Sequence, residues 1–467
     1  MFSRFLKRYV GDKAFYKHVM AITLPIMIQN GITHLVNMLD NIMVGNIKTI
    51  DVPVEMNGVA VANQLIFVFN LCIFGAVGGA GIFCAQYAGN KDNRGIAHTM
   101  RFKLLFCSLL TLIGIGVFWL WQEPLSRLFL LGESDPAIID LTLNYAKEYI
   151  YIMLIGLFPF TISQCYGSTL RETGQTAPPM VAGVVAVLAN LLGNAILIYG
   201  LFGAPAMGVR GAAIATVISR FVEMIILLVW THGRSDRNPF APIIYRSLRI
   251  PLRLVGQIFL RGLPLMVNEA AWSLGFVMIN QQYSTRGSHV LNANNISSTY
   301  WNVFAVSFMA VGIAVGIILG QKLGAGDREG ARADSRKLIG LSVALGVVVG
   351  IVYAACSFFI PYMYETTDAS RHLATQLMLV CACAMPIDAY AHAAYFTLRS
   401  GGQAFITFLF DSCFMWVVNV PFVYLMINCT TLPILAIFIM AQGLNLLKCF
   451  LGGWLVHKGI WIKTIVE

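Results

Sequence analysis

Stretches of apolar residues long enough to cross a lipid bilayer recur along this chain and limit the folds open to it. Hydrophobic residues make up 58% of the sequence and charged residues 12%, and the mean hydropathy is +0.72. A soluble globule of 467 residues needs more polar surface than this composition supplies. Because a helix needs about 20 apolar residues to cross the hydrocarbon core, we predict an all-α membrane protein.

Twelve apolar stretches can be placed, six in each half of the chain. They are residues 22–45, 58–84, 104–121, 143–166, 179–200, 211–230, 262–283, 295–320, 338–360, 375–397, 405–427 and 433–455. This placement predicts two six-helix lobes with short flanking segments. The predicted ranges are 1–20 for an N-terminal segment, 21–230 for the first lobe, 231–261 for a linker, 262–455 for the second lobe and 456–467 for a tail.

Motifs of the first half return in the second half in the same order. The pairs are Leu24–Met27 with Leu263–Met266, Ala85–Asp92 with Gly320–Asp327, and Thr169–Gln175 with Thr397–Gln403. Six crossings bring a chain back to the side from which it started. The two halves are therefore predicted to be parallel repeats, related by a pseudo-two-fold axis along the membrane normal. Repeats of this kind are typical of transporters that rock one half against the other.

The distribution of basic residues predicts the orientation. The formal net charge is +10, and most of the 32 Lys and Arg residues fall in segments that lie on one side if both termini share that side. Cytoplasmic loops carry such an excess, so we predict cytoplasmic termini. Topology explains the net charge, and nothing indicates nucleic-acid binding.

The segments outside the spans have their own patterns. The N-terminal residues 1–20 alternate aromatic and basic side chains without the apolar core of a signal peptide, which predicts an amphipathic helix on the bilayer surface. Part of the linker 231–261 is also expected to form an amphipathic helix on the inner surface. The 10 cysteines are scattered and lack metal-ligand spacing, so no metal site is expected beyond a Na⁺ site.

Ionisable residues inside apolar spans are the candidates for function, because a carboxylate at a helix centre costs about 2.5–3.5 kcal/mol on the translocon-insertion scale. Asp40 lies in the first span, with Asn30 and His34 one to three turns earlier on a nearby face. This stripe is typical of the lining of a wet pocket. The alternative is that Asp40 marks the outer end of the span and is only solvated.

Two amides lie on one face of the fifth span. Asn190 and Asn194 are four residues apart, and both offer oxygen atoms of the kind that Na⁺ prefers. Thr216 in the sixth span can add a hydroxyl group. The alternative is helix packing, since Asn forms hydrogen bonds between membrane helices.

Two further acids lie in the second half. Glu269 follows Pro264, and Asp388 follows a proline and shares a helix face with His392 and Tyr395. A proline frees a backbone carbonyl, and the shared face is suited to a proton relay. The alternative for His392 is an interface histidine. Because the repeat does not reproduce these acids, we expect the two halves to do different work.

The chain resembles the multidrug and toxic compound extrusion (MATE) family over essentially its full length. The resemblance rests on the Asp40–Gly45 segment after Pro25, the Gln-x-x-Gly loops at Gln86 and Gln321, and the twin Leu-Arg-x-x-Gly-Gln turns of the two halves. It implies two six-helix bundles in a bacterial inner membrane, acting as a monomer without an enzymatic reaction or an organic cofactor. The function implied is export of organic cationic or amphiphilic drugs by antiport with Na⁺ or H⁺.

The resemblance also implies roles for the candidate residues. Those of an ion-coupling site in the first lobe are Asp40, Asn190, Asn194 and Thr216; those of an acidic ion or substrate site in the second lobe are Glu269 and Asp388, with His392 and Tyr395 as the relay. Some members of the family have an acid at the position of Asn194, which leaves the coupling ion open between Na⁺ and H⁺.

Other functions remain as alternatives. A lipid-linked saccharide flippase of the same superfamily would need a strongly cationic cavity for pyrophosphate, whereas the candidates here are mainly acidic. A membrane-embedded transferase would need His, Asp or Arg clustered near one interface. A channel fits less well than alternating access with a two-lobed repeat that carries an isolated acid in each half.

Overall fold

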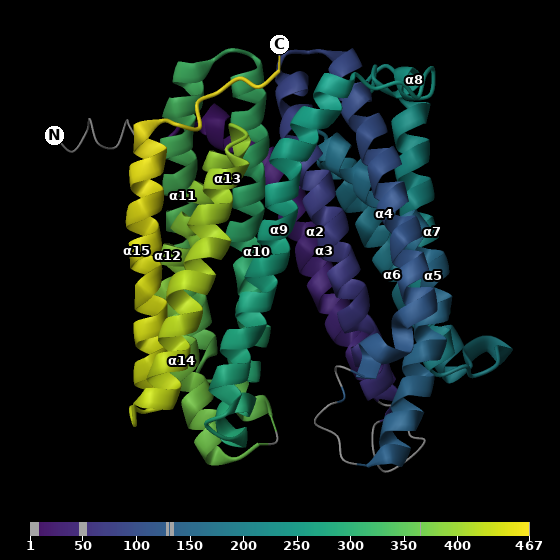
Figure 1. Cartoon of the computed structure of the whole chain (residues 1–467), viewed down its shortest axis with the longest axis vertical. Helices are drawn as coiled ribbons and strands as arrows, with labels where there is room; N and C mark the ends of the chain where they lie inside the picture. Colours follow the sequence, from purple (N-terminus) through teal and green to yellow (C-terminus); the bar gives the residue numbers. More distant parts are fainter. Residues whose placement is uncertain (1–8, 46–53, 128–129, 131–134, 365, 467) are drawn as a thin grey trace. The chain divides into compact units, whose positions relative to one another are not determined.

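The computed structural model describes residues 9–45, 54–127, 130, 135–364 and 366–466, without the side chains of residues 34–45, 54–56 and 288. The described residues form helices joined by turns, with no strand among them (Figure 1). An apolar chain in a bilayer must pair its backbone polar groups internally, and a helix does this within one segment.

The helices follow the predicted order. In the first half they are α2 (Lys13–Gly45), α3 (Val54–Gly89), α4 (Asn93–Arg127), α5 (Pro136–Glu172), α6 (Ala177–Tyr199) and α7 (Val209–Gly233). In the second half they are α9 (Leu252–Ser284), α10 (Ser288–Gly324), α11 (Arg328–Cys356), α12 (Asp368–Ser400), α13 (Ala404–Phe408), α14 (Val420–Cys429) and α15 (Ile434–Lys458). Short turns of helix complete the order: η1 (Leu201–Gly203), α8 (Ala241–Ile244), η2 (Ile360–Met363), η3 (Leu409–Cys413) and η4 (Met415–Asn419).

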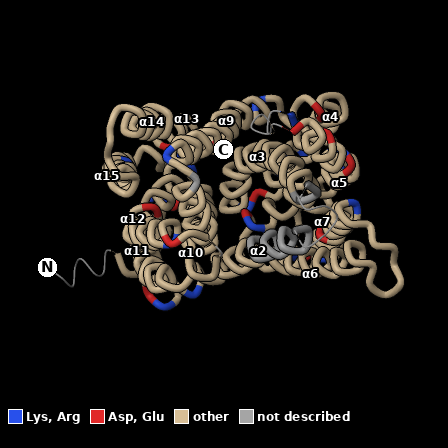
Figure 2. The backbone as a smooth tube through the Cα atoms, turned by 90° about the horizontal axis from the view of Figure 1, so that it is seen from below, with Lys and Arg blue, Asp and Glu red and all other residues tan. Residues whose placement is uncertain are grey.

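Eleven helical segments of the described part are long and apolar enough to span a membrane. They begin at Asn57 in α3, and the segment Ala404–Cys429 joins α13, η3, η4 and α14 into one span. Helix α2 covers the predicted first span. Together with it, the eleven segments agree with the twelve spans predicted from the sequence of this multi-pass membrane protein. Most of the backbone in Figure 2 carries no charged side chain, as a bilayer requires.

The described residues form two compact units. The N-unit comprises Ile28–Cys84 and Asn93–Gly256, and the C-unit comprises Met1–Met27, Ala85–Asp92 and Gln257–Glu467. In the N-unit α5 packs against α4 and α7, and α6 packs against α7. In the C-unit α12 is central, because it packs against α10, α11 and α15.

The core of the C-unit is apolar and extends over several helices. Phe308 of α10, Met378 and Met385 of α12 and Tyr353 of α11 are fully buried in one cluster. A second cluster brings Val19 from the first turns of α2 onto the α10 residues 310–319. The beginning of α2 therefore belongs to the C-unit by packing, although it lies at the other end of the sequence.

The two Gln-x-x-Gly motifs of the repeat contact each other within the C-unit. A Cβ atom added to Gly89 would overlap the backbone of Gln321, and one added to Gly324 would overlap the backbone of Gln86. The contact is reciprocal, as a pseudo-two-fold relation between the repeats requires. Glycine at both positions lets the ends of α3 and α10 approach at backbone distance.

The segments flanking the spans are helical in part, and their place on a bilayer surface stays a prediction. From Lys13 onward the N-terminal residues continue without a break into the first span as part of α2, and residues 1–8 lie outside the described residues. In the linker, helix comprises the end of α7 up to Gly233, the four residues of α8 and the start of α9 from Leu252 onward. The α8 turn is held by Arg101, whose guanidinium donates to the carbonyl oxygens of Ile243 at 2.5 Å and Ile244 at 2.7 Å.

Candidate functional site

Helix α12 carries a stripe of polar residues through the C-unit. Asp388, His392, Tyr395 and Arg399 recur at intervals of three or four residues, so they share one face of the helix. The first three were predicted to belong to the site. Tyr395 is 7% exposed, which leaves its hydroxyl group dependent on partners inside the unit.

Glu269 of α9 meets this stripe at two points. The Tyr395 hydroxyl donates to Glu269 Oε1 at 3.3 Å, and Arg399 Nη1 lies 3.6 Å from the same oxygen. Arg399 belongs to the twin Leu-Arg turn of the repeat. The predicted pair of Glu269 and Tyr395 is therefore brought together, with an arginine that sequence analysis had placed only in a loop motif.

Asn268 extends the network to a further acid. Its Nδ2 donates to Tyr395 Oη at 3.2 Å and to Asp411 Oδ2 at 3.1 Å, and its Oδ1 accepts from the Ser412 backbone N–H at 3.2 Å. Asn268 is completely buried. Asn268 therefore connects α9 to η3, which is a π-helical turn of the eleventh span. Such turns are frequent at functional sites.

Asp411 forms an ion pair with Lys448 of α15 inside the C-unit. The side chains are 16% and 15% exposed, respectively, and the Lys448 ammonium also lies 5.2 Å from the centre of the Phe410 ring. Sequence analysis missed both residues as members of a site, because each by itself is an isolated charge near an apolar run. The available signal was that α15 places a lysine well inside a 25-residue span.

Asp388 lies at the other end of the stripe. Its Oδ1 accepts a hydrogen bond from Asn445 of α15 at 3.3 Å, and Lys448, three residues further along α15, is within electrostatic reach. His392 lies near Phe308, with 6.0 Å between the ring centres and 44° between the ring planes. No hydrogen bond between His392 and Tyr395 is present among the described contacts, so the relay between these two residues stays a prediction.

The candidate residues of the N-unit also meet. Asn190 Nδ2 donates to Thr216 Oγ1 at 3.2 Å, and Asn194 Nδ2 donates to Asn190 Oδ1 at 3.3 Å. Asn190 is 5% exposed and Asn194 1%. The structure therefore joins α6 and α7 by the three polar side chains that were predicted together. Asp40 is part of α2, and its side chain lies outside the described residues.

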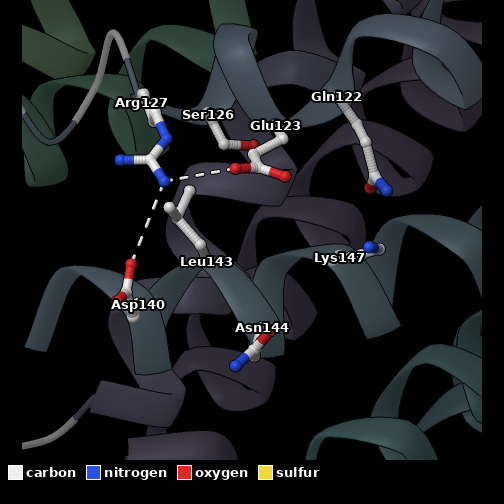
Figure 3. Close-up of a pocket in the computed structure, with 8 residues that line it drawn as sticks. All are labelled: Gln122, Glu123, Ser126, Arg127, Asp140, Leu143, Asn144 and Lys147. Carbon is white, nitrogen blue, oxygen red and sulfur yellow. Dashed lines mark hydrogen bonds and ion pairs between the residues drawn. The ribbon is translucent and has the colours of Figure 1, made fainter. Parts of the chain in front are cut away.

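A small pocket of about 230 Å³ lies elsewhere in the N-unit, where α4 leaves helical geometry at Trp121 and α5 begins. Figure 3 shows Arg127 directed toward Glu123 and Asp140, and these ion pairs measure 3.2 Å and 3.9 Å. The three charged side chains are more than half exposed. We regard this pocket as a solvated ion-pair corner and not as part of the site.

Comparison with known proteins identifies the family. The family model described as MatE matches residues 25–196 and 264–425, which is one segment in each half of the chain. The chain belongs to the MatE family. The two matched segments agree with the internal repeat, and the MATE resemblance drawn from the sequence motifs is confirmed.

Individual relatives agree with the MATE assignment. A probable multidrug resistance protein NorM of Thermotoga maritima is 29% identical over 301 residues, which is 64% of this chain and 60% of that protein. A probable multidrug resistance protein YoeA of Bacillus subtilis is 24% identical over 82% of each chain. A solved structure described as the outward-facing conformation of a multidrug resistance MATE family transporter superposes with a TM-score of 0.85 at 18% identity, over 97% of each chain. The predicted all-α fold with two six-helix lobes is thereby confirmed as a MATE fold.

Proposed function

We propose that this MATE protein is a secondary active transporter that exports organic cationic or amphiphilic compounds in exchange for Na⁺ or H⁺. The observation that carries the proposal is the network of Glu269, Asp388 and Asp411 within membrane-spanning helices of the C-unit. Acids in such positions typically bind an ion or a charged substrate, because the bilayer penalises them otherwise. The relatives named as multidrug resistance proteins support the same substrate class.

The proposed mechanism is alternating access with linked acids. A cation that neutralises a carboxylate changes the relative stability of two conformations, provided that it binds one of them more tightly. Export then requires that the drug and the coupling ion have opposite preferences, either at a shared acid or at linked acids. We assign the ion to Asp40 with Asn190, Asn194 and Thr216, and assign Glu269 and Asp388 to an ion or substrate site in the C-unit.

The location follows from the charge distribution. We propose a bacterial inner membrane with both termini in the cytoplasm, where basic loops are retained. A monomer is sufficient for this mechanism, because the two repeats supply the two parts that move. No step of the mechanism makes or breaks a covalent bond of the transported compound.

Transport into liposomes tests the proposal. Purified protein is reconstituted, and movement of tetraphenylphosphonium is measured with Na⁺ and pH gradients imposed separately, for wild type and Asp40→Asn. We expect gradient-driven transport in wild type and its loss in the variant, because an amide cannot bind and release the coupling cation as a carboxylate does.

A matched control and a contradicting result complete the test. Asp368→Asn changes an acid whose side chain is 85% exposed at the start of α12, and it should transport normally. Full transport by Asp40→Asn would remove Asp40 from the coupling site. Inserted wild-type protein that transports the cation under neither gradient would contradict the function itself.

A further inference from the structure

The position of Lys448 requires a physical explanation that packing does not supply. Lys448 lies well inside the apolar helix α15, and its side chain is only 15% exposed. A buried ion pair is weakly stabilising at best compared with apolar residues of similar size. An apolar pair would stabilise the protein as well as the Asp411–Lys448 pair does. We therefore look for a role of this pair other than stability.

Charges within the network are unequal. Its acids are Glu269, Asp388 and Asp411, and its permanent cations are Arg399 and Lys448. With all of them ionised, the three acids and two cations leave a single net negative charge. His392 faces the same region, within electrostatic reach of Asp411 and Lys448.

The pairing indicates which acid carries that charge. Arg399 lies against Glu269, and Lys448 lies against Asp411. Among the described residues Asp388 forms no ion pair within 4.0 Å and instead accepts a hydrogen bond from the neutral amide of Asn445. Asp388 is thus the acid at which an external cation gains most from binding.

We propose that Lys448 is a tethered counter-cation that limits the site to one positive charge, so that the transporter selects monocations over dications. The proposal rests on the cation-exporting function proposed above and names the class of substrate that this site takes. A monocation bound near Asp388 completes the neutralisation of the network. A dication leaves an excess positive charge in a medium of low dielectric constant, where unpaired charge is strongly unfavourable. Lys448 acts as a specificity-determining residue because it occupies Asp411, which a second positive charge would need.

The test compares two cations of similar chemistry and different charge. Wild type, Lys448→Met, Asp411→Asn and the double variant are reconstituted, and transport of tetraphenylphosphonium is compared with that of the dication methyl viologen. Binding of both cations to the purified proteins is measured by calorimetry. Lys458→Met is the matched control, because this lysine lies at the end of the same helix with its ammonium over Trp454.

The charge count gives a different expectation for each variant. Lys448→Met leaves two net negative charges, so the ratio of dication to monocation affinity should rise about tenfold, which corresponds to about 1.4 kcal/mol. Asp411→Asn leaves an unpaired lysine, so both cations should bind more weakly. The double variant again has one net negative charge, and its ratio should return to that of wild type. Lys458→Met should leave the ratio unchanged.

Several results would overturn the proposal. An unchanged ratio in folded Lys448→Met protein would do so. If that variant does not fold, the other two decide, because monocation affinity must fall in Asp411→Asn and recover in the double variant. A wild type that transports neither cation would contradict the proposed function, whereas the binding ratios would still confirm or contradict the charge rule.

Discussion

Individual side chains in this protein form ion pairs in two very different environments. Lys103 of α4 is completely buried; its ammonium lies 2.5 Å from Glu172 Oε2 and donates to Ser168 Oγ at 2.7 Å. Gly81 provides the space, because a Cβ atom there would overlap the Glu172 carboxylate. By contrast, Arg210 and Glu148 form their 2.6 Å pair with side chains 62% and 38% exposed. The same interaction should therefore have unequal energetic consequences.

We expect Lys103→Met to lower the free energy of unfolding of the N-unit by about 3–5 kcal/mol, because it removes the buried ammonium that is paired with the Glu172 carboxylate. Arg210→Met should have a much smaller effect, because water screens an exposed pair. Thermal denaturation of the purified variants in detergent measures both losses of stability. Adding Glu172→Gln to Lys103→Met should recover much of the loss. Equal effects of the two single variants would contradict the assignment.

Among helices, the ends of α3 and α10 make a contact at backbone distance within the C-unit. Gly89 and Gly324 each face the backbone of the other motif, where a methyl group has no space. Backbone cannot move aside as the end of a flexible side chain can. The contact therefore depends on both glycines at once.

Gly89→Ala and Gly324→Ala should each destabilise the protein by about 1–3 kcal/mol, as overpacking of a close contact does. Gly116→Ala is the matched control, because it lies within α4 with nothing near its Cβ position, and alanine favours helix. The melting temperature of each purified variant is the measurement. Unchanged values for Gly89→Ala and Gly324→Ala would show that the crossing tolerates side chains, and an equal decrease for Gly116→Ala would show that the loss is not specific to the crossing.

In the molecule as a whole, the segment after α15 connects distant parts of the chain. It crosses the end of the C-unit (Figure 1), where the Ile465 backbone N–H donates to Gln86 Oε1 at 2.8 Å and Thr464 Oγ1 donates to the Leu323 carbonyl at 3.0 Å. Trp461 in this segment is completely buried. Both motifs of the repeat are thus held by the same few residues.

We expect Trp461→Ala to lower the free energy of unfolding by about 3–5 kcal/mol, because the substitution leaves a large cavity in the apolar cluster. Trp454→Ala provides the comparison, since this tryptophan is 57% exposed on α15 and its loss should have little effect. Chemical denaturation in detergent, monitored by the remaining tryptophan fluorescence, distinguishes them. Comparable losses in the two variants would mean that packing of Trp461 does not contribute specially to the stability of the C-unit.

Much of this architecture was predictable because it depends on local properties of the chain. Hydropathy over about 20 residues places each span, and the repeat requires two similar halves. The same reasoning selected Glu269 and Tyr395, which the fold brings to 3.3 Å, and the set Asn190, Asn194 and Thr216. Each of these residues is unusual within its own helix, and that is visible without the fold.

The partners of these residues depended on tertiary structure. Asp411 and Lys448 are 37 positions apart, and neither residue predicts the other, because periodicity within one helix says nothing about which neighbour it faces. Arg399 was visible only as part of a repeated turn until packing placed it against Glu269. The chain alone thus specifies the number, order and apolar character of its helices, since the bilayer acts on every segment separately. The balance of charge inside the C-unit arises only when four elements (α9, α12, η3 and α15) pack together.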